Sequence, residues 1–317
     1  MSTQAALIPG RPVIQYFNAF GGWSEGNETF SGRPRPSVAQ ITYYQKSRHI
    51  FGDLKIEIFD QDGKLIDTIP GSTHRGLNRT SWFMRLKAPD VAPAATALNG
   101  AQRGPRVLPG TYTVKLTKGD QTYTEQVKVV MDPRATYTLD DRKAEFELSM
   151  KIYNLLEHMS WGVESIEGVR NAANARAAKL PEKDLLRQQL AKLATDCDAL
   201  RSKIVATKEG GMITGEERIR ELIGELYGNV TGYDGRPTEY QVARTESLGH
   251  ELQDVIDDFQ KLTQANLPGI NGSLKKKKME TIVVLSETNW QKKKTGSSDA
   301  AGGSLIQESS DTLEESD

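Results

Sequence analysis

The sequence contains a single cysteine, Cys197, among 317 residues. One cysteine allows no internal disulfide, which excludes a small secreted fold held together by disulfides but leaves the compartment open. No run approaches the roughly 20 apolar residues that a transmembrane helix needs. Residues 1–10 have no basic region followed by an apolar core, so we expect no signal peptide there. The localisation therefore remains unknown at this level.

The motifs that usually carry chemistry are also missing. The sequence has no His-Glu-x-x-His, no Cys-x-x-Cys, no Gly-rich phosphate loop and no Gly-x-Ser-x-Gly, so we expect no metal, no cofactor and no serine nucleophile. The four histidines fall in unrelated segments: His49, His74, His158 and His250. Paired carboxylates for glycoside hydrolysis meet only in space, so the question of an enzyme stays open for that one reaction.

The chain also lacks a large net charge of either sign, since its formal net charge is −1. No global field attracts the chain to nucleic acid or to an anionic membrane. Two lysine clusters, 275–278 and 292–294, could do so locally, but Trp290 is the only aromatic residue close to them. We favour a segment that is either solvated or paired within the chain, for example with the acidic residues that follow, and nucleic acid is not an expected partner.

The length fits about two domains of roughly 150 residues. In residues 31–134 apolar and polar positions alternate with a period of two, the pattern of half-buried β-strands, most clearly at 54–58. Asp62-Gly63 then predicts a hairpin turn. About seven short strands separated by Gly and Asp turns predict an immunoglobulin-like antiparallel β-sandwich. A Pro-, Ala- and Gly-rich stretch, 87–108, interrupts it as a long loop.

From residue 138 the hydrophobic period changes to about 3.6, which is typical of helices. Residues 138–267 are predicted to form an antiparallel bundle of about four helices, because the connections are short. Together with the sandwich, this defines an α+β multidomain chain. The helix after Pro181 has an apolar seam in steps of four and three: Leu186, Leu190, Leu193, Cys197, Leu200 and Ile204. We expect the seams to form the core, with a dimer through one open seam as the alternative.

The last fifty residues divide by charge. Residues 268–295 form a basic segment that begins at Pro268-Gly269, where the last helix is expected to end. This segment contains a short β-prone run at 281–285. Residues 296–317 contain six acidic residues, no basic residue and much Ser and Gly, so we expect an acidic disordered tail.

Several motifs, taken in order, resemble a known family. They are Ile41-Thr42-Tyr43-Tyr44, residues 54–60 followed by Asp62-Gly63-Lys64, Gly76-Leu77-Asn78-Arg79 with Trp82, Leu108-Pro109-Gly110-Thr111-Tyr112-Thr113-Val114, and Met131-Asp132-Pro133-Arg134. Their order is similar to the C-terminal region of bacterial proteins with a sortilin-type β-propeller of neuraminidase (BNR) repeats, often labelled glycosyl hydrolases. The resemblance covers residues 30–265.

In that family a propeller comes first, then an immunoglobulin-like sandwich with these motifs, then helices. The resemblance implies the same sandwich and helices here, and a periplasmic or secreted parent family. The propeller has no counterpart in this sequence, so the chain resembles the tail of a longer protein. No catalytic residue is carried over, because the matching motifs look structural.

Residues 1–30 are expected to form an N-terminal extension with several aromatic side chains. Those near its glycines are the candidate interaction surface: Tyr16, Phe17, Phe20, Trp23 and Phe30. Aromatic residues beside glycine can stack on a sugar, or they can form an apolar patch that packs on a propeller. We favour the second interpretation.

The sequence therefore predicts a non-catalytic accessory module that packs on a β-propeller or binds a protein partner. The alternative is a glycan-binding or glycoside-hydrolase-related protein, which the family label and the N-terminal aromatic residues suggest.

Overall fold

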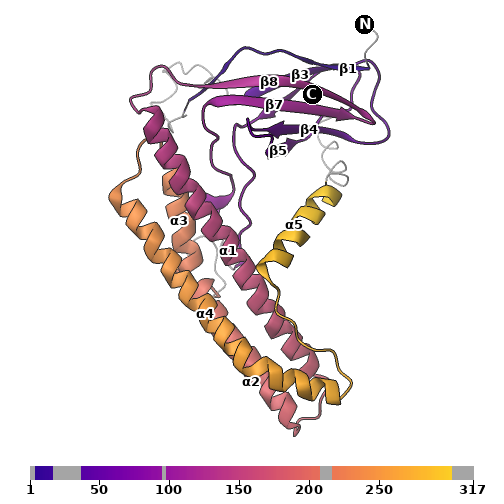
Figure 1. Ribbon diagram of the computed structural model, residues 1–317, viewed down its shortest axis with the longest axis vertical. Coiled ribbons are helices and arrows are strands. Elements are labelled where there is room, and N and C mark those ends of the chain that lie inside the picture. Colours follow the sequence, from indigo (N-terminus) through magenta and orange to yellow (C-terminus); the bar gives the residue numbers. More distant parts are fainter. Residues whose placement is uncertain (1–3, 17–36, 95–97, 208–215, 302–317) are drawn as a thin grey trace, which may run out of the picture. The chain divides into compact units, whose positions relative to one another are not determined.

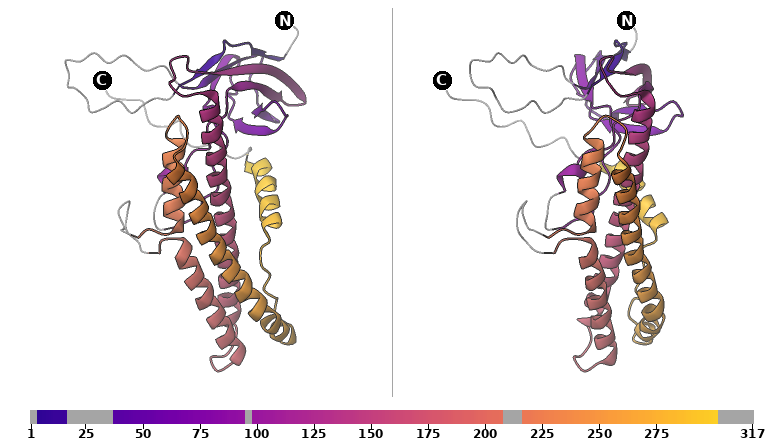
Figure 2. Two further views of the ribbon diagram at one scale, coloured as in Figure 1. Left: turned by 60° about the vertical axis from the view of Figure 1, so that its left-hand side comes forward. Right: turned by 90° about the vertical axis from the view of Figure 1, so that its left-hand side faces the viewer.

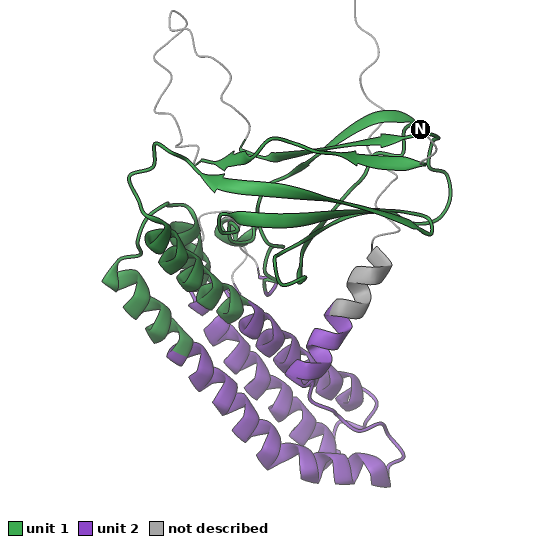
Figure 3. Ribbon diagram, turned by 45° about the horizontal axis from the view of Figure 1, so that its top comes forward, with its two compact units in different colours: residues 1–91, 97–156, 221–249 green, residues 92–96, 157–220, 250–317 purple. Residues whose placement is uncertain are grey.

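The computed structural model describes residues 4–16, 37–94, 98–207 and 216–301. These residues form a mixed α/β structure with two β-sheets and five α-helices (Figure 1). The chain divides into two compact units, coloured separately in Figure 3. Unit 1 comprises Met1–Val91, Ala97–Leu156 and Glu221–Gly249, and unit 2 comprises Ala92–Thr96, Glu157–Arg220 and His250–Asp317. Residue 134, where the sequence predicts a domain boundary, lies inside unit 1.

Unit 1 contains both sheets. The three-stranded sheet is antiparallel and has the order β1-β3-β6, and the five-stranded sheet has the order β2-β8-β7-β4-β5. In the second sheet β2 runs parallel to β8, and the other neighbouring strands are antiparallel. The strands are β1 (Ala5–Ile8), β2 (Val13–Gln15), β3 (Ala39–Gln45), β4 (Leu54–Phe59), β5 (Leu65–Ile69), β6 (Gly76–Trp82), β7 (Gly110–Lys118) and β8 (Gln121–Met131).

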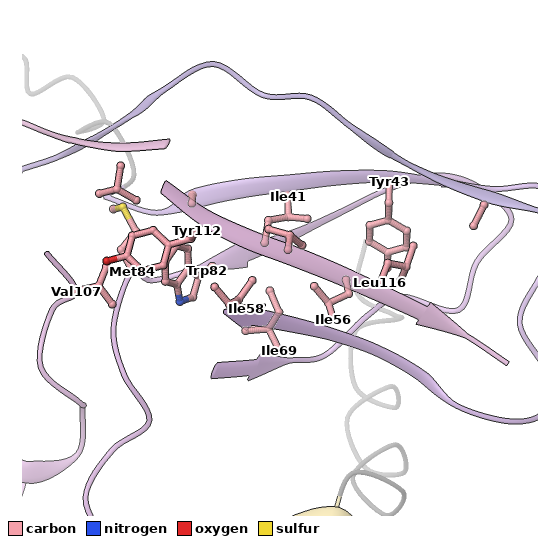
Figure 4. Close-up of a cluster of buried hydrophobic side chains, with 14 residues drawn as sticks. Ile41, Tyr43, Ile56, Ile58, Ile69, Trp82, Met84, Val107, Tyr112 and Leu116 are labelled. Atoms are coloured by element: carbon pink, nitrogen blue, oxygen red, sulfur yellow. The ribbon is translucent and has the colours of Figure 1, made fainter. Parts of the chain in front are cut away.

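The alternating pattern of the sequence is realised in these strands. Along β3, Ala39, Ile41 and Tyr43 are buried while Gln40 is exposed, because successive side chains of a strand point to opposite faces. Side chains from both sheets share one buried apolar cluster, in which Ile56 and Leu116 are completely covered (Figure 4). The two sheets therefore enclose a single hydrophobic core.

Trp82 and Tyr112 form an aromatic pair in this core. Their ring centroids lie 5.0 Å apart in an edge-on arrangement, which is the geometry that aromatic pairs favour. The hydroxyl of Tyr112 donates a 2.6 Å hydrogen bond to the carbonyl oxygen of Leu108. Burial raises the pKa of Tyr112 to about 12, and the negative charge of Asp60 adds to the shift. Tyr112 thus ties the long loop to the beginning of β7.

The predicted hairpin at Asp62-Gly63 is present between β4 and β5. The carboxylate of Asp60 accepts hydrogen bonds from the backbone N–H groups of Asp62 (3.0 Å) and Lys64 (2.8 Å). Gly63 adopts a φ of 76°, a left-handed conformation that glycine reaches without steric cost. The turn chemistry in the sequence thus leads directly to the observed pairing.

The N-terminal residues differ from the expected extension. β1 and β2 lie within residues 1–30 and belong to the two sheets, β1 beside β3 and β2 beside β8. β1 has only four residues, which is too short for a clear alternating pattern in the sequence. β2, with three residues, lies in the β-rich run 13–17, which the sequence does indicate as a strand.

Three helices contribute to unit 1. They are α1 (Leu139–Ala177), α3 (Ile219–Thr231) and α4 (Glu239–Lys276), of which residues 139–156, 221–231 and 239–249 belong to this unit. α1 begins with a reciprocal cap, in which the backbone N–H of Thr138 donates to Asp141 and that of Asp141 donates to Thr138. The N–H bond from Thr138 is the main reason that the pKa of Asp141 falls to about 2.

Unit 2 consists of the remaining parts of α1 and α4 with α2 (Leu185–Ile204) and α5 (Glu287–Ala301). The seam expected for the second helix is buried throughout. Arg201 of α2 bonds to Glu167 of α1 at 2.7 Å, and Arg170 of α1 bonds to Asp198 of α2 at 2.7 Å. Figure 2 shows α1, α2 and α4 side by side within this unit. Among the described residues, no helix combines the length and the apolar character needed to cross a membrane.

The expectation that the last helix ends before Pro268 is wrong. α4 continues to Lys276 with Pro268 in its interior. A proline there costs about 3 kcal/mol, but the buried apolar stripe continues from Leu267, just before the proline, to Ile270 and Leu274 beyond it. Their packing offsets the missing hydrogen bond, so the helix persists.

The region after α4 also differs from its prediction. The β-prone run 281–285 is extended but belongs to neither sheet, because side chains satisfy part of its backbone. Of the predicted disordered stretch 296–317, residues 296–301 continue α5, and residues 302–317 lie outside the described residues. The packed first turns of α5 supply the costly helix nucleus, after which each added residue costs little.

We predict that Tyr112→Phe lowers the free energy of unfolding by about 1–3 kcal/mol, because the carbonyl of Leu108 loses its buried donor while the ring stays in place. Urea denaturation measures this loss. The matched variant Tyr240→Phe, at an exposed position, should change stability by less than about 0.5 kcal/mol. Equal losses in both variants would contradict the role of the Tyr112 hydroxyl.

Candidate functional site

The aromatic residues predicted as an interaction surface are mostly outside the described residues. Phe17, Phe20, Trp23 and Phe30 all fall there. Tyr16 is half-buried, and its carbonyl oxygen accepts a 2.8 Å hydrogen bond from the hydroxyl of Ser37. The surface predicted at residues 16–30 therefore stays a prediction.

Among the described residues, side chains of the types that bind metal ions do not come together in a group. No three of the His, Cys, Asp and Glu residues in 4–16, 37–94, 98–207 and 216–301 are arranged to hold a metal ion. His49 bonds to the carbonyl of Gly52 at 2.8 Å, and His158 contacts Glu287 at 3.3 Å. These two histidines thus have local structural partners.

The lysine clusters are paired with helices of unit 2. Lys277 bonds to Asp184 at the start of α2 at 2.7 Å, and Lys293 bonds to Glu164 of α1 at 2.7 Å. Lys294 forms an ion pair with Glu157 of α1. These three lysines pair with acidic residues that precede them in the chain, which reduces the positive charge that the clusters would offer to nucleic acid.

Unit 1 contains a cluster of three arginines, the buried Arg106 and Arg142 and the half-buried Arg85, which we call the arginine cluster. Arg106 pairs with Asp234, and Arg142 pairs with Glu145. Burial, together with repulsion between the guanidinium groups, lowers the pKa of each arginine to about 10. All three remain charged at neutral pH, so the cluster balances three positive charges against two carboxylates.

The cluster holds the loop between β6 and β7. Arg142 of α1 donates to the carbonyl oxygens of Arg106 (3.2 Å) and Val107 (3.3 Å), and Arg85 donates to that of Gly104 (2.8 Å). The base of the loop is closed by backbone bonds from Leu86 to Pro105 and from Val107 to Met84, each 2.9 Å long. The guanidinium groups thus satisfy loop carbonyls that no strand pairs with.

The far side of the same loop packs on α3. A Cβ atom on Gly100 would lie 2.4 Å from the carbonyl oxygen of Gly224, so only glycine fits there. The hydroxyl of Tyr227 donates to the carbonyl of Arg103 at 2.9 Å. The loop expected at 87–108 is therefore fastened at several points by α1 and α3.

The buried carboxylates of unit 1 are committed to this structural network. Asp234 also accepts a 2.9 Å bond from the hydroxyl of Tyr137, and Glu145 accepts a 2.9 Å bond from Ser149. Both carboxylates are therefore occupied by an arginine and a hydroxyl group of the same unit.

We predict that Arg142→Met destabilises the chain by about 3–5 kcal/mol, because it leaves the carboxylate of Glu145 buried without its counter-charge. Thermal unfolding followed by circular dichroism measures the loss. The double variant Arg142→Met/Glu145→Leu should recover much of it, since both charges are then absent. The exposed neighbour Lys143→Met serves as the control. A double variant as unstable as the single one would contradict the ion-pair explanation.

Cys197 lies on the buried seam of α2. Burial raises the pKa of its thiol to about 11, and the charge of Asp196 contributes to the shift. A thiol reacts as its thiolate, so we predict that iodoacetamide modifies the native chain at pH 8 about a hundredfold more slowly than the urea-unfolded chain. Mass spectrometry of timed samples checks this rate. Equal rates would show that Cys197 is accessible in the folded state.

Unit 1 also exposes large apolar side chains at one end of its pair of sheets. Register pairs Ala6, Tyr44 and Leu77 in a row across the three-stranded sheet, on the face away from the core. Leu77 is 70% exposed, and β3 then leads into the loop 46–53, where Phe51 is 88% exposed and Ile50 is also exposed. We call Tyr44, Ile50, Phe51 and Leu77 the sandwich-end patch.

The loop that presents Phe51 is held in place by hydrogen bonds. The backbone N–H of His49 donates to the carbonyl of Thr73 (2.9 Å), and that of Gly119 donates to Asp53 (2.8 Å). Lys118 donates to the carbonyl of Ser47 at 2.8 Å, and Gly52 takes a φ of 84°. Phe51 and Ile50 are thus displayed on an ordered loop, which reduces the entropy lost when a partner covers them.

Four exposed basic residues are close in sequence to residues of the patch: Lys46, Arg48, Arg75 and Arg79. Sequence reasoning missed this surface, because the pattern of β6 marks Leu77 as an ordinary strand position. The apolar pair Ile50-Phe51 between polar residues was the available signal.

Comparison with protein-family models, with curated proteins and with solved structures finds no match in any of the three.

Proposed function

We propose that this chain is a non-catalytic interaction module that binds a protein partner through the sandwich-end patch. The observation that carries the proposal is the exposure of Phe51 and Leu77 at the same end of an ordered sandwich. Covering a Phe or a Leu side chain yields about 1.5–3 kcal/mol each. Large aromatic and apolar anchors of this kind dominate the energetics of protein interfaces.

We also propose the immunoglobulin-like class for the sandwich. The orders β1-β3-β6 and β2-β8-β7-β4-β5 support it, since immunoglobulin-like sandwiches group their strands in a comparable way. The bond from Tyr112 to Leu108 supports it too, because a tyrosine near the start of the equivalent strand bonds back to the preceding backbone in that class. For the helices, we propose a bundle.

The chemistry of the patch favours a partner surface with an apolar centre and an acidic rim. The exposed arginines and lysine near the patch would steer such a partner and select against a basic one. The β-propeller that the family resemblance implies remains our candidate for this partner. A propeller presents loops and short edges at its two ends, which a sandwich end could contact.

Carbohydrate binding is the alternative function. It depends on the aromatic residues at 16–30, of which the structure describes Tyr16. Its distinguishing prediction is quenching of Trp23 fluorescence by a glycan, which the protein-binding proposal does not make.

We predict that Phe51→Asp weakens partner binding about tenfold or more, because a charge replaces an apolar anchor. A photo-crosslinking amino acid at position 51 of the full chain identifies the partner in the source cells, and calorimetry with the purified partner measures the affinity. The matched variant is Phe83→Asp, at a side chain that is 66% exposed just beyond the other end of β6.

Phe83→Asp should leave the affinity within about twofold of the original, since Phe83 lies outside the sandwich-end patch. The proposal is contradicted if both variants bind alike, or if position 51 crosslinks to nothing while position 83 does.

A further inference from the structure

The segment after α4 is held in unit 2 in an unusual way. We call residues 279–294 the strap, which comprises an extended run followed by the first turns of α5. Asn271 of α4 accepts the backbone N–H of Ile282 (2.8 Å) and donates to its carbonyl (2.9 Å). One amide side chain thus satisfies both polar groups of a residue, as a neighbouring strand would do.

Side chains of α1 bind other carbonyl groups of the strap. Arg176 donates to the carbonyl oxygens of Glu280 (2.7 Å) and Thr281 (3.0 Å). The indole of Trp161 (2.9 Å) and the hydroxyl of Ser165 (3.0 Å) both donate to that of Leu285. Figure 2 shows the strap running beside α1 in unit 2. Side chains of α1 and α4 therefore form hydrogen bonds with four carbonyl groups and one N–H group of the strap backbone.

Two side chains of the strap act as anchors. Ile282 is 2% exposed, whereas its neighbour Val283 is 80% exposed. Trp290 is buried, and its indole donates a 2.7 Å bond to Glu164 of α1. Lys294 lies 5.4 Å above the Trp290 ring and pairs with Glu157. Specificity thus comes from a branched apolar residue, a tryptophan eight positions later, and lysines that meet acidic residues of α1.

Main-chain hydrogen bonds combined with a few anchored side chains are how proteins bind extended peptides. We infer that Arg176, Asn271, Trp161, Ser165, Glu164 and Glu157 form a peptide-binding site, which we call the strap site, and that its partner is the strap of a second copy of this chain. Apart from the bond from Met279 to Leu274 at the end of α4, the contacts of the strap named above do not depend on its covalent link to α4. A second copy carries the matching peptide by construction, so exchange of identical segments needs no new interface chemistry.

The joint before the strap is suited to such an exchange. Lys278 has a φ of 58°, a left-handed conformation that costs a non-glycine residue free energy. The N–H of Met279 closes the end of α4 on the carbonyl of Leu274 at 2.9 Å. A change of conformation at Lys278 would therefore release the strap and leave the preceding helix intact. The link supplies a high local concentration of strap, so the intact chain holds its own strap first.

The test uses full-length variants and a labelled synthetic peptide with the sequence of residues 279–294. The variant Ile282→Ser/Trp290→Ala removes both anchors from the tethered strap and leaves the strap site empty. Fluorescence anisotropy should show that it binds the peptide about tenfold or more tightly than the unchanged chain, whose own strap competes. In the peptide, Ile282→Ser should abolish binding and the neighbouring Val283→Ser should not.

A complementation experiment tests the second copy directly. The variant Asn271→Leu/Glu164→Lys disables the strap site and leaves its strap free. Mixed with the anchor-deleted variant, it should form a one-to-one heterodimer by light scattering, while each variant alone stays monomeric. The control mixes the anchor-deleted variant with the unchanged chain. It should give little heterodimer, because the strap of the unchanged chain is held by its own strap site.

Failure of the folded anchor-deleted variant to bind the peptide overturns the strap site. Peptide binding without a heterodimer overturns the second copy as the partner. If the anchor-deleted variant does not fold, a protease site inserted after Lys278 gives a cleaved full-length protein. Its strap should then exchange with the labelled peptide, and no exchange would overturn the proposal. The sandwich-end patch lies in unit 1, so these results do not depend on the proposed function.

Discussion

The guanidinium group of Arg142 is the contact on which the arrangement within unit 1 depends. It is buried, faces the carboxylate of Glu145, and donates to two carbonyl groups just before β7. Loops normally run over the surface, because a buried loop carries backbone groups that need partners. The arginine cluster supplies those partners. It allows the chain between β6 and β7 to be packed against helices while both strands keep their places in the two sheets.

This use of buried charge explains why unit 1 has polar side chains where a core would be expected. Arg106 and Glu145 are buried, the side chain of Asp234 is 5% exposed, and each has a charged or hydrogen-bonding partner. Buried ion pairs add little net stability, but removing one partner is costly. The network therefore specifies how the loop is placed, and the alternating apolar residues of the strands supply the driving force for folding.

The periodic parts of the fold could be predicted from the sequence. The change of period near residue 138 locates the transition from strands to helices, and the seam of α2 is buried residue by residue. The Asp62-Gly63 turn follows from local chemistry alone. These features depend on neighbours in the chain, and a single sequence contains that information.

The rest depends on contacts between distant residues. Asp234 lies 128 positions from its partner Arg106, and Asn271 satisfies Ile282 across a turn. Nothing local marks these residues as partners. β1 is too short to show a hydrophobic period. The helix α4 continues through Pro268 because apolar residues beyond the proline are buried. The sequence predicts an interaction surface at the aromatic residues in 16–30. It does not predict the surface around Ile50 and Phe51, because their exposure depends on the sheet register and on the conformation of the loop 46–53.

The proposed function requires that a protein partner covers the sandwich-end patch. Hydrogen–deuterium exchange of the full chain, alone and bound to the partner, tests this most directly. We expect slower exchange in residues 46–53 and 76–79 of the complex, with residues 83–86 unchanged. Protection elsewhere, with unchanged exchange in the two patch segments, would contradict it.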